Sequence, residues 1–288
     1  MSDFRLKVFQ SVAKNLSFTK ASQELFVSQP AITKHIQELE ATYQTRLFDR
    51  QGSKISLTES GRLLLEHCER ILEDYKRLEY EMHLLHNEYI GELKLGASTT
   101  IAQYVLPPLL GSFIGKFPQV NLSLLNGNSR EIEAALQEHR IDLGLVEGVF
   151  RLPNLKYTTF LEDELVAVVH SKSRLLLPEE ITPQDLPAIP LVLRERGSGT
   201  LDVIERSLQK HGVKLASLHV LMYLGSTESI KLFLENSDCM GIVSIRSICK
   251  ELAAGTFRVV EIKDMPMLRD FCFVQLQGQE GGLSQAFM

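Results

Sequence analysis

Residues 25 to 40, LFVSQPAITKHIQELE, decide how the first part of the chain folds. Ser28 is a residue type that helix N-caps prefer, and Pro30 falls in the first helical turn, where its missing N–H costs no hydrogen bond. Three apolar residues at helical spacing mark the buried face: Ile32, Ile36 and Leu39. The stretch therefore predicts an amphipathic helix that begins after Ser28 and carries a polar front.

Two further helices are predicted before this one. Residues 4–14 have amphipathic spacing, and residues 18–26 follow Ser17, a candidate N-cap. The second helix ends only two or three residues before the helix of residues 29–40 begins. Two helices joined by so short a turn have helix-turn-helix spacing.

A small hairpin, or wing, is predicted next to these helices. Residues 46–58, RLFDRQGSKISLT, read as two extended pieces around Gly52, and they carry Arg50 and Lys54. Residues 1–57 contain eight Lys or Arg against five Asp or Glu, although the whole chain has a net charge of −5. A small basic module on an acidic body suits an anionic partner at one end of the molecule.

From Leu57 to Tyr89, apolar or small residues recur in alternating steps of four and three. The members of this heptad seam include Leu64, Ile71, Leu78 and Leu85. A seam of this length favours pairing with a second helix, and hence a homodimer or homotetramer. One long helix that packs on its own domain is the open alternative.

After Gly91 the pattern changes to short apolar runs separated by helical stretches. Alternation of this kind predicts a parallel sheet with helices on its faces. The pattern occurs twice, and a last apolar run, residues 269–276, returns at the end of the chain. We therefore expect two α/β lobes with a cleft between them, the first made of about residues 91–161 plus 267–288 and the second of about 162–266.

Small polar residues recur where the predicted strands give way to helices. They are Ser98, Thr99, Thr100, Asn128, Ser129, Ser198, Gly199, Thr200, Ser226 and Thr227. Carboxyl ends of strands line ligand crevices in open α/β sheets, and helix N-termini present free N–H groups to anions. Each residue taken singly also fits an ordinary N-cap, so the recurrence is what favours a pocket.

The composition excludes several classes of protein. Hydrophobic residues make up 44% and charged residues 23%, which is typical of folded globular domains. No window of eighteen apolar residues and no signal peptide are found, so we expect a cytoplasmic protein without a membrane partner. The four cysteines lack the spacing of a disulfide framework or zinc site. No catalytic, metal or cofactor motif stands out, and we expect no enzyme and no cofactor.

The order of these parts resembles the LysR-type transcriptional regulators. The similarity covers SFTKASQELFVSQPAITKHIQELE, then RLFDR and LTESG, and more weakly GELKLGAS, DLGLVEG and LGSTESIK. RERGSGT, residues 194–200, is similar to a subset tied to carbon-dioxide fixation or sulfur assimilation. The family usually has Gly where this chain has Gln44, and it commonly continues through a final helix where this chain has LSQAFM.

The resemblance implies roles for individual residues. The helix from Gln29 enters the major groove of double-stranded DNA, with base or phosphate contacts from Gln29, Pro30, Thr33 and Lys34, a further contact open for His35, and added contacts from Arg50 and Lys54. The ten residues at the strand ends form the effector pocket, for which we expect a small anion. RNA polymerase is a further partner that the resemblance allows.

The resulting hypothesis is a multidomain α+β chain. Residues 1–57 form a winged helix-turn-helix domain, residues 58–90 a linker and dimerisation helix, and residues 91–288 a two-lobed effector domain similar to periplasmic binding proteins. The function expected is transcription regulation controlled by an effector. The alternative is a two-lobed binding protein or enzyme that uses its N-terminal module only for association.

Overall fold

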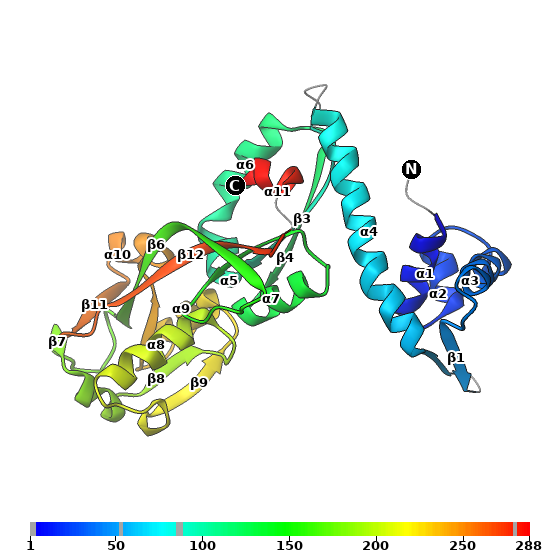
Figure 1. The fold of residues 1–288 in the computed structure, drawn as a ribbon. Coiled ribbons are helices and arrows are strands. Elements are labelled where there is room, and N and C mark those ends of the chain that lie inside the picture. Colours follow the sequence, from blue (N-terminus) through cyan, green and yellow to red (C-terminus); the bar gives the residue numbers. More distant parts are fainter. Residues whose placement is uncertain (1–3, 52–53, 85–88, 279–280) are drawn as a thin grey trace. The chain divides into compact units, whose positions relative to one another are not determined.

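The structure is a computed structural model that describes residues 4–51, 54–84, 89–278 and 281–288 (Figure 1). Contacts within the chain divide it into two compact units, Met1–Glu88 and Tyr89–Met288. No helix in the described part is both long enough and apolar enough to cross a membrane.

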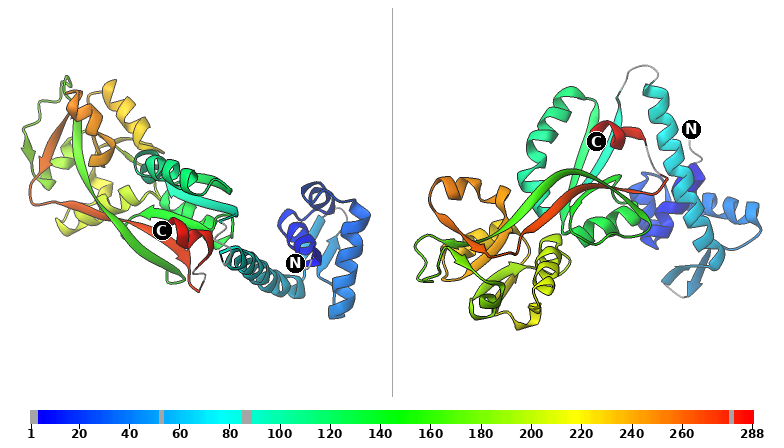
Figure 2. Two further views of the ribbon diagram at one scale, coloured as in Figure 1. Left: turned by 90° about the horizontal axis from the view of Figure 1, so that it is seen from above. Right: turned by 60° about the vertical axis from the view of Figure 1, so that its left-hand side comes forward.

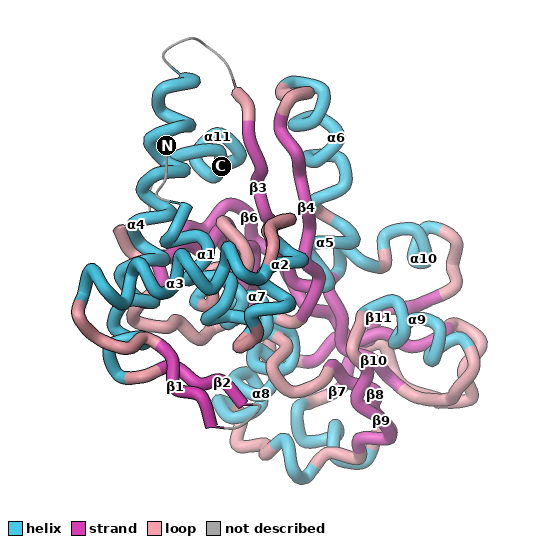
Figure 3. Tube along the Cα trace, turned by 90° about the vertical axis from the view of Figure 1, so that its right-hand side faces the viewer, coloured by secondary structure: helices cyan, strands magenta, loops and turns pink. Residues whose placement is uncertain are grey.

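The first unit is a winged helix-turn-helix, as predicted. Its elements are α1 (Phe4–Asn15), α2 (Phe18–Glu24), α3 (Gln29–Tyr43), β1 (Phe48–Gln51), β2 (Lys54–Leu57) and α4 (Glu59–Leu84). Strands β1 and β2 pair antiparallel and form the wing. Figure 3 shows this hairpin extending from the group of helices.

Helix α4 packs by its first half on the core of its own unit. Cys68 and Leu72 are buried in that core, and Leu64 is partly buried against it. The start of α4 lies so close to Leu47 that a Cβ on Gly61 would be 2.2 Å from the Leu47 carbonyl oxygen. The predicted seam is thus divided. Leu64 packs against the core of its own unit, whereas Ile71 and Leu78 are exposed. Leu85, the last member, lies outside the described residues.

The second unit contains a mixed sheet with helices around it. Its first elements are β3 (Gly91–Ser98), α5 (Thr99–Tyr104), α6 (Leu106–Lys116), β4 (Val120–Gly127), α7 (Ser129–Gln137), β5 (Leu143–Glu147) and β6 (Leu155–His170). Then follow β7 (Glu180–Ile181), β8 (Leu191–Arg194), α8 (Gly199–Lys210), β9 (Val220–Leu224), α9 (Thr227–Glu235), β10 (Met240–Ser244), α10 (Cys249–Ala253), β11 (Phe257–Ile262), β12 (Met267–Leu276) and α11 (Gly282–Phe287).

Two long strands join the two lobes of this unit. The sheet order is β4-β3-β5-β12-β6-β10-β8-β9, with β3, β4 and β5 parallel in one lobe and β8, β9 and β10 parallel in the other. Strands β6 and β12 run antiparallel between these groups, as Figures 1 and 2 show. The sheet is therefore mixed. The alternation of strands and helices predicted parallel strands, and this is correct within each lobe but not for β6 and β12. The return strand was predicted, but not that β6 begins at Leu155 and crosses both lobes.

Candidate functional site

The first turn of α3 is built as its sequence predicts. Ser28 is in an extended conformation and its hydroxyl accepts a hydrogen bond from the Ala31 N–H at 3.4 Å. Pro30 lies in the first turn. Thr33 donates its hydroxyl to the Gln29 carbonyl at 3.1 Å. The helix therefore begins at Gln29 with its first N–H groups partly satisfied by the cap.

Helix α3 has one apolar and one polar face. Ile32, Ile36 and Leu39 are buried in the core, whereas Gln29, Pro30 and Lys34 are exposed and Thr33 is half-buried. His35 packs edge-on against Phe4 of α1, with ring centroids 5.4 Å apart. The contact with Phe4 turns His35 toward α1. The front of the helix, meaning its outward polar face, then consists of Gln29, Pro30, Thr33 and Lys34.

A hollow of about 350 Å³ lies beside this front. It is lined by Phe18, Thr33, Ile36, Gln37, Glu40, Arg46 and Phe48. Gln37 and Arg46 were not predicted, although Gln37 follows Thr33 by one helical turn and Arg46 directly precedes the LFDR stretch. The backbones of Arg50 and Lys54 lie on the wing strands, but their side chains lie outside the described part of the chain.

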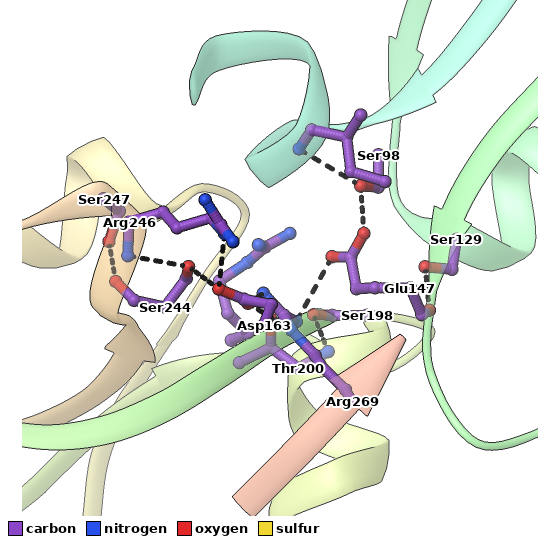
Figure 4. A network of polar contacts seen from close by, with 12 residues as sticks. Ser98, Ser129, Glu147, Asp163, Ser198, Thr200, Ser244, Arg246, Ser247 and Arg269 are labelled. Carbon is purple, nitrogen blue, oxygen red and sulfur yellow. Dashed lines mark hydrogen bonds and ion pairs between the residues drawn. The ribbon is translucent and has the colours of Figure 1, made fainter. Parts of the chain in front are cut away.

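In the second unit, two of the predicted hydroxyls meet at the end of β5. Ser98 caps α5 and donates its hydroxyl to the carboxylate of Glu147. Ser129, at the start of α7, donates to the main-chain carbonyl of Glu147 at 2.7 Å. Asn128 caps α7 and its backbone N–H binds Glu131 in a capping box. Figure 4 shows Ser98 beside the Glu147 carboxylate and Ser129 beside the Glu147 main chain.

Arg269, in the crossing strand β12, connects this point to the second lobe. Its side chain is fully buried, lies 2.7 Å from the Asp163 carboxylate, and is 3.6 Å from that of Glu147. It also donates to the Thr200 hydroxyl at 2.8 Å. Because Arg269 and Asp163 are directly opposite in the β12–β6 register, their pairing is a consequence of the sheet.

The Asp163 carboxylate also contacts residues of the second lobe. Ser244, at the end of β10, donates to Asp163 at 2.7 Å, and Arg246 lies 3.6 Å from it. Two carboxylates and two guanidinium groups thus form one chain of contacts from the first lobe to the second (Figure 4). Buried charges require such pairing, because an isolated one would be strongly destabilising.

The N-terminus of α8 approaches the first lobe closely at Gly197 and Gly199. A Cβ on Gly199 would lie 1.9 Å from the Glu147 carbonyl oxygen. The Arg130 N–H donates to the Gly197 carbonyl at 3.3 Å, and Ser198 caps α8. Only glycine at residue 199 permits this approach of the two backbones.

Several buried polar atoms at this edge have no hydrogen-bond partner among the described residues. They are the hydroxyls of Thr99 and Thr100 and Nη1 of Arg194. The Arg194 side chain is almost wholly buried and binds Glu195 at 2.8 Å and the Gly225 carbonyl at 3.3 Å. Buried donors without partners cost free energy, so these atoms are free to bond a water molecule or a ligand.

Ser226 and Thr227 lie outside the chain of contacts that passes through Glu147 and Arg269. Ser226 caps α9, with its hydroxyl accepting from the Ser229 N–H at 3.1 Å, and Thr227 is buried in the first turn. Sequence reasoning missed Glu147, Asp163 and Arg269. Glu147 and Arg269 each adjoin an apolar strand run, where a buried charge demands a partner, whereas Asp163 stands between Glu162 and Glu164 and the sequence does not single it out.

A second contact joins the lobes at α5 and α9. Tyr104 donates its hydroxyl to Glu228, and Lys231 binds Glu228 at 2.9 Å and Glu251 at 2.5 Å. Burial opposes the charge on Lys231, but the hydrogen bonds to Glu251 and Glu228 prevail and raise the pKa of Lys231. Lys231 is therefore a charged anchor for α9 and α10 at neutral pH.

Comparison with known proteins decides the family. Residues 4–62 match the family described as "Bacterial regulatory helix-turn-helix protein, lysR family", and residues 86–288 match "LysR substrate binding domain". The chain belongs to the LysR family. The resemblance inferred from the sequence is confirmed, and so is the combination of winged helix-turn-helix and α/β effector domain.

Individual LysR relatives agree with this assignment. A probable RuBisCO transcriptional regulator of Cyanidioschyzon merolae is 32% identical over 92% of this chain and 88% of its own length. The regulatory domain of Synechocystis PCC6803 CcmR, solved in complex with 2-PG, is 28% identical with a TM-score of 0.61, covering 68% of this chain and 93% of that one.

Full-length CbnR complexed with its target DNA has the same fold. Its TM-score is 0.63 at 23% identity, over 100% of this chain and 97% of that one. The protein is therefore a DNA-binding transcription regulator with an effector-binding domain, and regulators of this family are oligomeric. The alternative of a binding protein or enzyme that uses the N-terminal module only for association is not favoured.

Proposed function

We propose that the protein reads DNA with the front of α3, through Gln29, Pro30, Thr33 and Lys34, supported by Arg50 and Lys54 of the wing. The single observation that carries this assignment is the division of α3 into a core face and an exposed polar front that starts at a capped N-terminus. The major groove admits an α-helix, and recognition helices contact base edges with their first residues.

Removing the positive charge of Lys34 tests this assignment. Lys34→Ala should weaken DNA binding about tenfold and lower the slope of log affinity against log salt by about 1 if Lys34 contacts a phosphate. The measurement is a gel shift at several salt concentrations on a fragment selected in vitro by the wild-type protein. Lys7→Ala, an exposed lysine of α1, is the matched control. Unchanged binding by the combined Thr33→Ala and Lys34→Ala variant would show that the groove assignment is wrong.

We further propose that the effector binds between the lobes, against the ten predicted residues from Ser98 to Thr227. The support is the unpartnered, buried hydroxyls of Thr99 and Thr100, together with a polar network that includes Ser98 and Thr200 from opposite lobes. A small anion is the ligand class proposed, because the first turns of α7, α8 and α9 offer N–H groups at this edge. An effector acts by binding one arrangement of the lobes more tightly than another.

The carboxylate of Glu147 competes with such an anion for the Ser98 hydroxyl. Glu147→Gln keeps the size of the side chain and removes its charge, so affinity for an anion should rise about a hundredfold, since one charge at about 6 Å is worth about 2.8 kcal/mol at an effective dielectric of about 20. Calorimetry with 2-PG as the first probe measures the change. Asp142→Asn serves as the control, because Asp142 lies just before β5, at the end of that strand opposite to Glu147, and its carboxylate accepts from the Lys94 N–H. Weaker binding by Glu147→Gln than by wild type would rule out an anion beside Ser98.

The oligomer is proposed to form in part through the exposed second half of the seam on α4, at Ile71 and Leu78. Apolar side chains at heptad spacing lose water contact only against another helix. We propose a cytoplasmic location because the DNA target of a transcription regulator lies there, and no enzymatic activity because the relatives are regulators.

A further inference from the structure

Phe26, in the turn between α2 and α3, is an exposed aromatic residue. Its side chain is 94% exposed, whereas the next most exposed large apolar residue described in this unit, Leu63, is 59% exposed. Its two neighbours in sequence, Leu25 and Val27, both pack against the core of the winged helix-turn-helix. Phe26 therefore takes no part in the packing that holds the turn in place.

The backbone at Phe26 is also in a conformation that phenylalanine adopts at a cost. Its φ is +54°, in the left-handed region. The Val27 N–H binds the Ser22 carbonyl at 3.1 Å, and the Phe26 N–H binds the Gln23 carbonyl at 3.4 Å. These two bonds form a Schellman motif, and Phe26 occupies its left-handed residue, where glycine is usual and asparagine is tolerated.

The C-terminus of α3 has the same motif, with Gln44 at the left-handed position. Gln44 has a φ of +51°, with the Thr45 N–H bound to Glu40 at 3.1 Å and the Gln44 N–H bound to Ala41 at 3.3 Å. Gln44 is exposed and polar, so it adds backbone strain but no exposed aromatic surface. Gln44 is thus an internal reference for the cost of a non-glycine residue in this motif.

Phe26 lies close to the bases that α3 is proposed to read. It precedes Gln29, the first residue of α3, by three positions, which limits the separation of their Cα atoms to about 10 Å, or roughly three base-pair steps. A phenylalanine side chain has no hydrogen-bonding group. In the major groove the thymine 5-methyl group is the apolar feature that such a ring can cover.

We propose that Phe26 is a DNA-contacting residue whose ring packs on a thymine methyl group beside the bases met by Gln29 and Lys34. The assignment rests on the proposed DNA-reading role of α3. It explains why a side chain that stabilises neither the turn nor the core is present at a position that favours glycine: the apolar surface is covered only when DNA is bound.

The test compares Phe26→Asn with Gln44→Asn in the full chain. The probe is a DNA fragment selected in vitro by the wild-type protein and amplified with either thymine or uracil, which lacks the methyl group. Phe26→Asn should bind the thymine fragment about five- to tenfold more weakly than wild type does, the size expected for one buried apolar contact. On the uracil fragment the two proteins should differ little. Gln44→Asn should match wild type on both fragments.

Thermal unfolding separates this contact from a folding defect. Phe26→Asn should unfold at the same temperature as wild type or higher, because asparagine tolerates the left-handed conformation. Wild-type affinity of Phe26→Asn for the thymine fragment would overturn the proposal, and so would an equal loss on both fragments or a lower unfolding temperature. If Lys34→Ala loses binding while Phe26→Asn does not, only the role of Phe26 fails. If Lys34→Ala and Thr33→Ala together change nothing, the reading role of α3 fails.

Discussion

Arg269→Met should destabilise the effector domain by about 3–5 kcal/mol, because it leaves two buried carboxylates without their shared cation. Asp163 is fully buried and Glu147 is 2% exposed, so neither gains much from water when the guanidinium is lost. For a unit of this size the loss corresponds to a fall in the thermal midpoint of about 6–20 °C. Differential scanning calorimetry of the full chain measures it as a shift of the effector-domain transition.

Arg246→Met is the matched control for this variant. Arg246 lies 3.6 Å from the same Asp163 carboxylate, but its side chain is 42% exposed, so its removal should cost at most about 1 kcal/mol. A double variant, Arg269→Met with Asp163→Leu, should recover part of the lost stability because one unpaired charge disappears. Equal midpoints for Arg269→Met and Arg246→Met would contradict a stabilising role for the buried pair.

Gly199→Ala should open the contact between the lobes next to the proposed effector site. The added Cβ would lie 1.9 Å from the Glu147 carbonyl oxygen, and backbone atoms on both sides cannot yield as a flexible side chain would. We expect a loss of about 1–3 kcal/mol or more in the free energy of unfolding. We also expect any thermal stabilisation by a bound anion to be lost, since the N-cap Ser198 and the first turn of α8, which contains Thr200, must move.

Gly225→Ala is the control for the same kind of change at the neighbouring strand end. No atom lies within 4 Å of a Cβ at that position, and its φ is not in the left-handed region, so stability should change little. Thermal unfolding with and without the anion distinguishes the two variants. If Gly199→Ala behaved like Gly225→Ala, the close approach of the lobes at Glu147 would not exist in solution.

Local features of this protein were predictable because their physics is local. The start of α3 depends on Ser28 and Pro30, which act within one helical turn. The winged helix-turn-helix follows from apolar spacing and short turns, and the hydroxyls at the strand ends follow from the alternation of strands and helices. The sequence alone therefore points to Ser98, Ser129 and Thr200.

The chain of charges between the lobes was not predictable in the same way. Arg269 and Asp163 are 106 residues apart, and their pairing depends on the register of β12 against β6, of which the first half of β6 was missed. A charge inside an apolar run shows only that some partner must exist. The division of the α4 seam was hidden for a similar reason, since Leu64 and Ile71 have the same heptad spacing and differ only in what packs on them.

The sequence by itself determined where α3 begins, which of its faces is buried, and that small polar residues end the strands. These properties depend on interactions a few residues apart along the chain. Only the tertiary structure decided that Glu147, Asp163 and Arg269 connect the lobes, and that Phe26 is exposed in a left-handed turn. Burial and the pairing of distant charges arise when segments far apart in sequence pack together, so no local pattern records them.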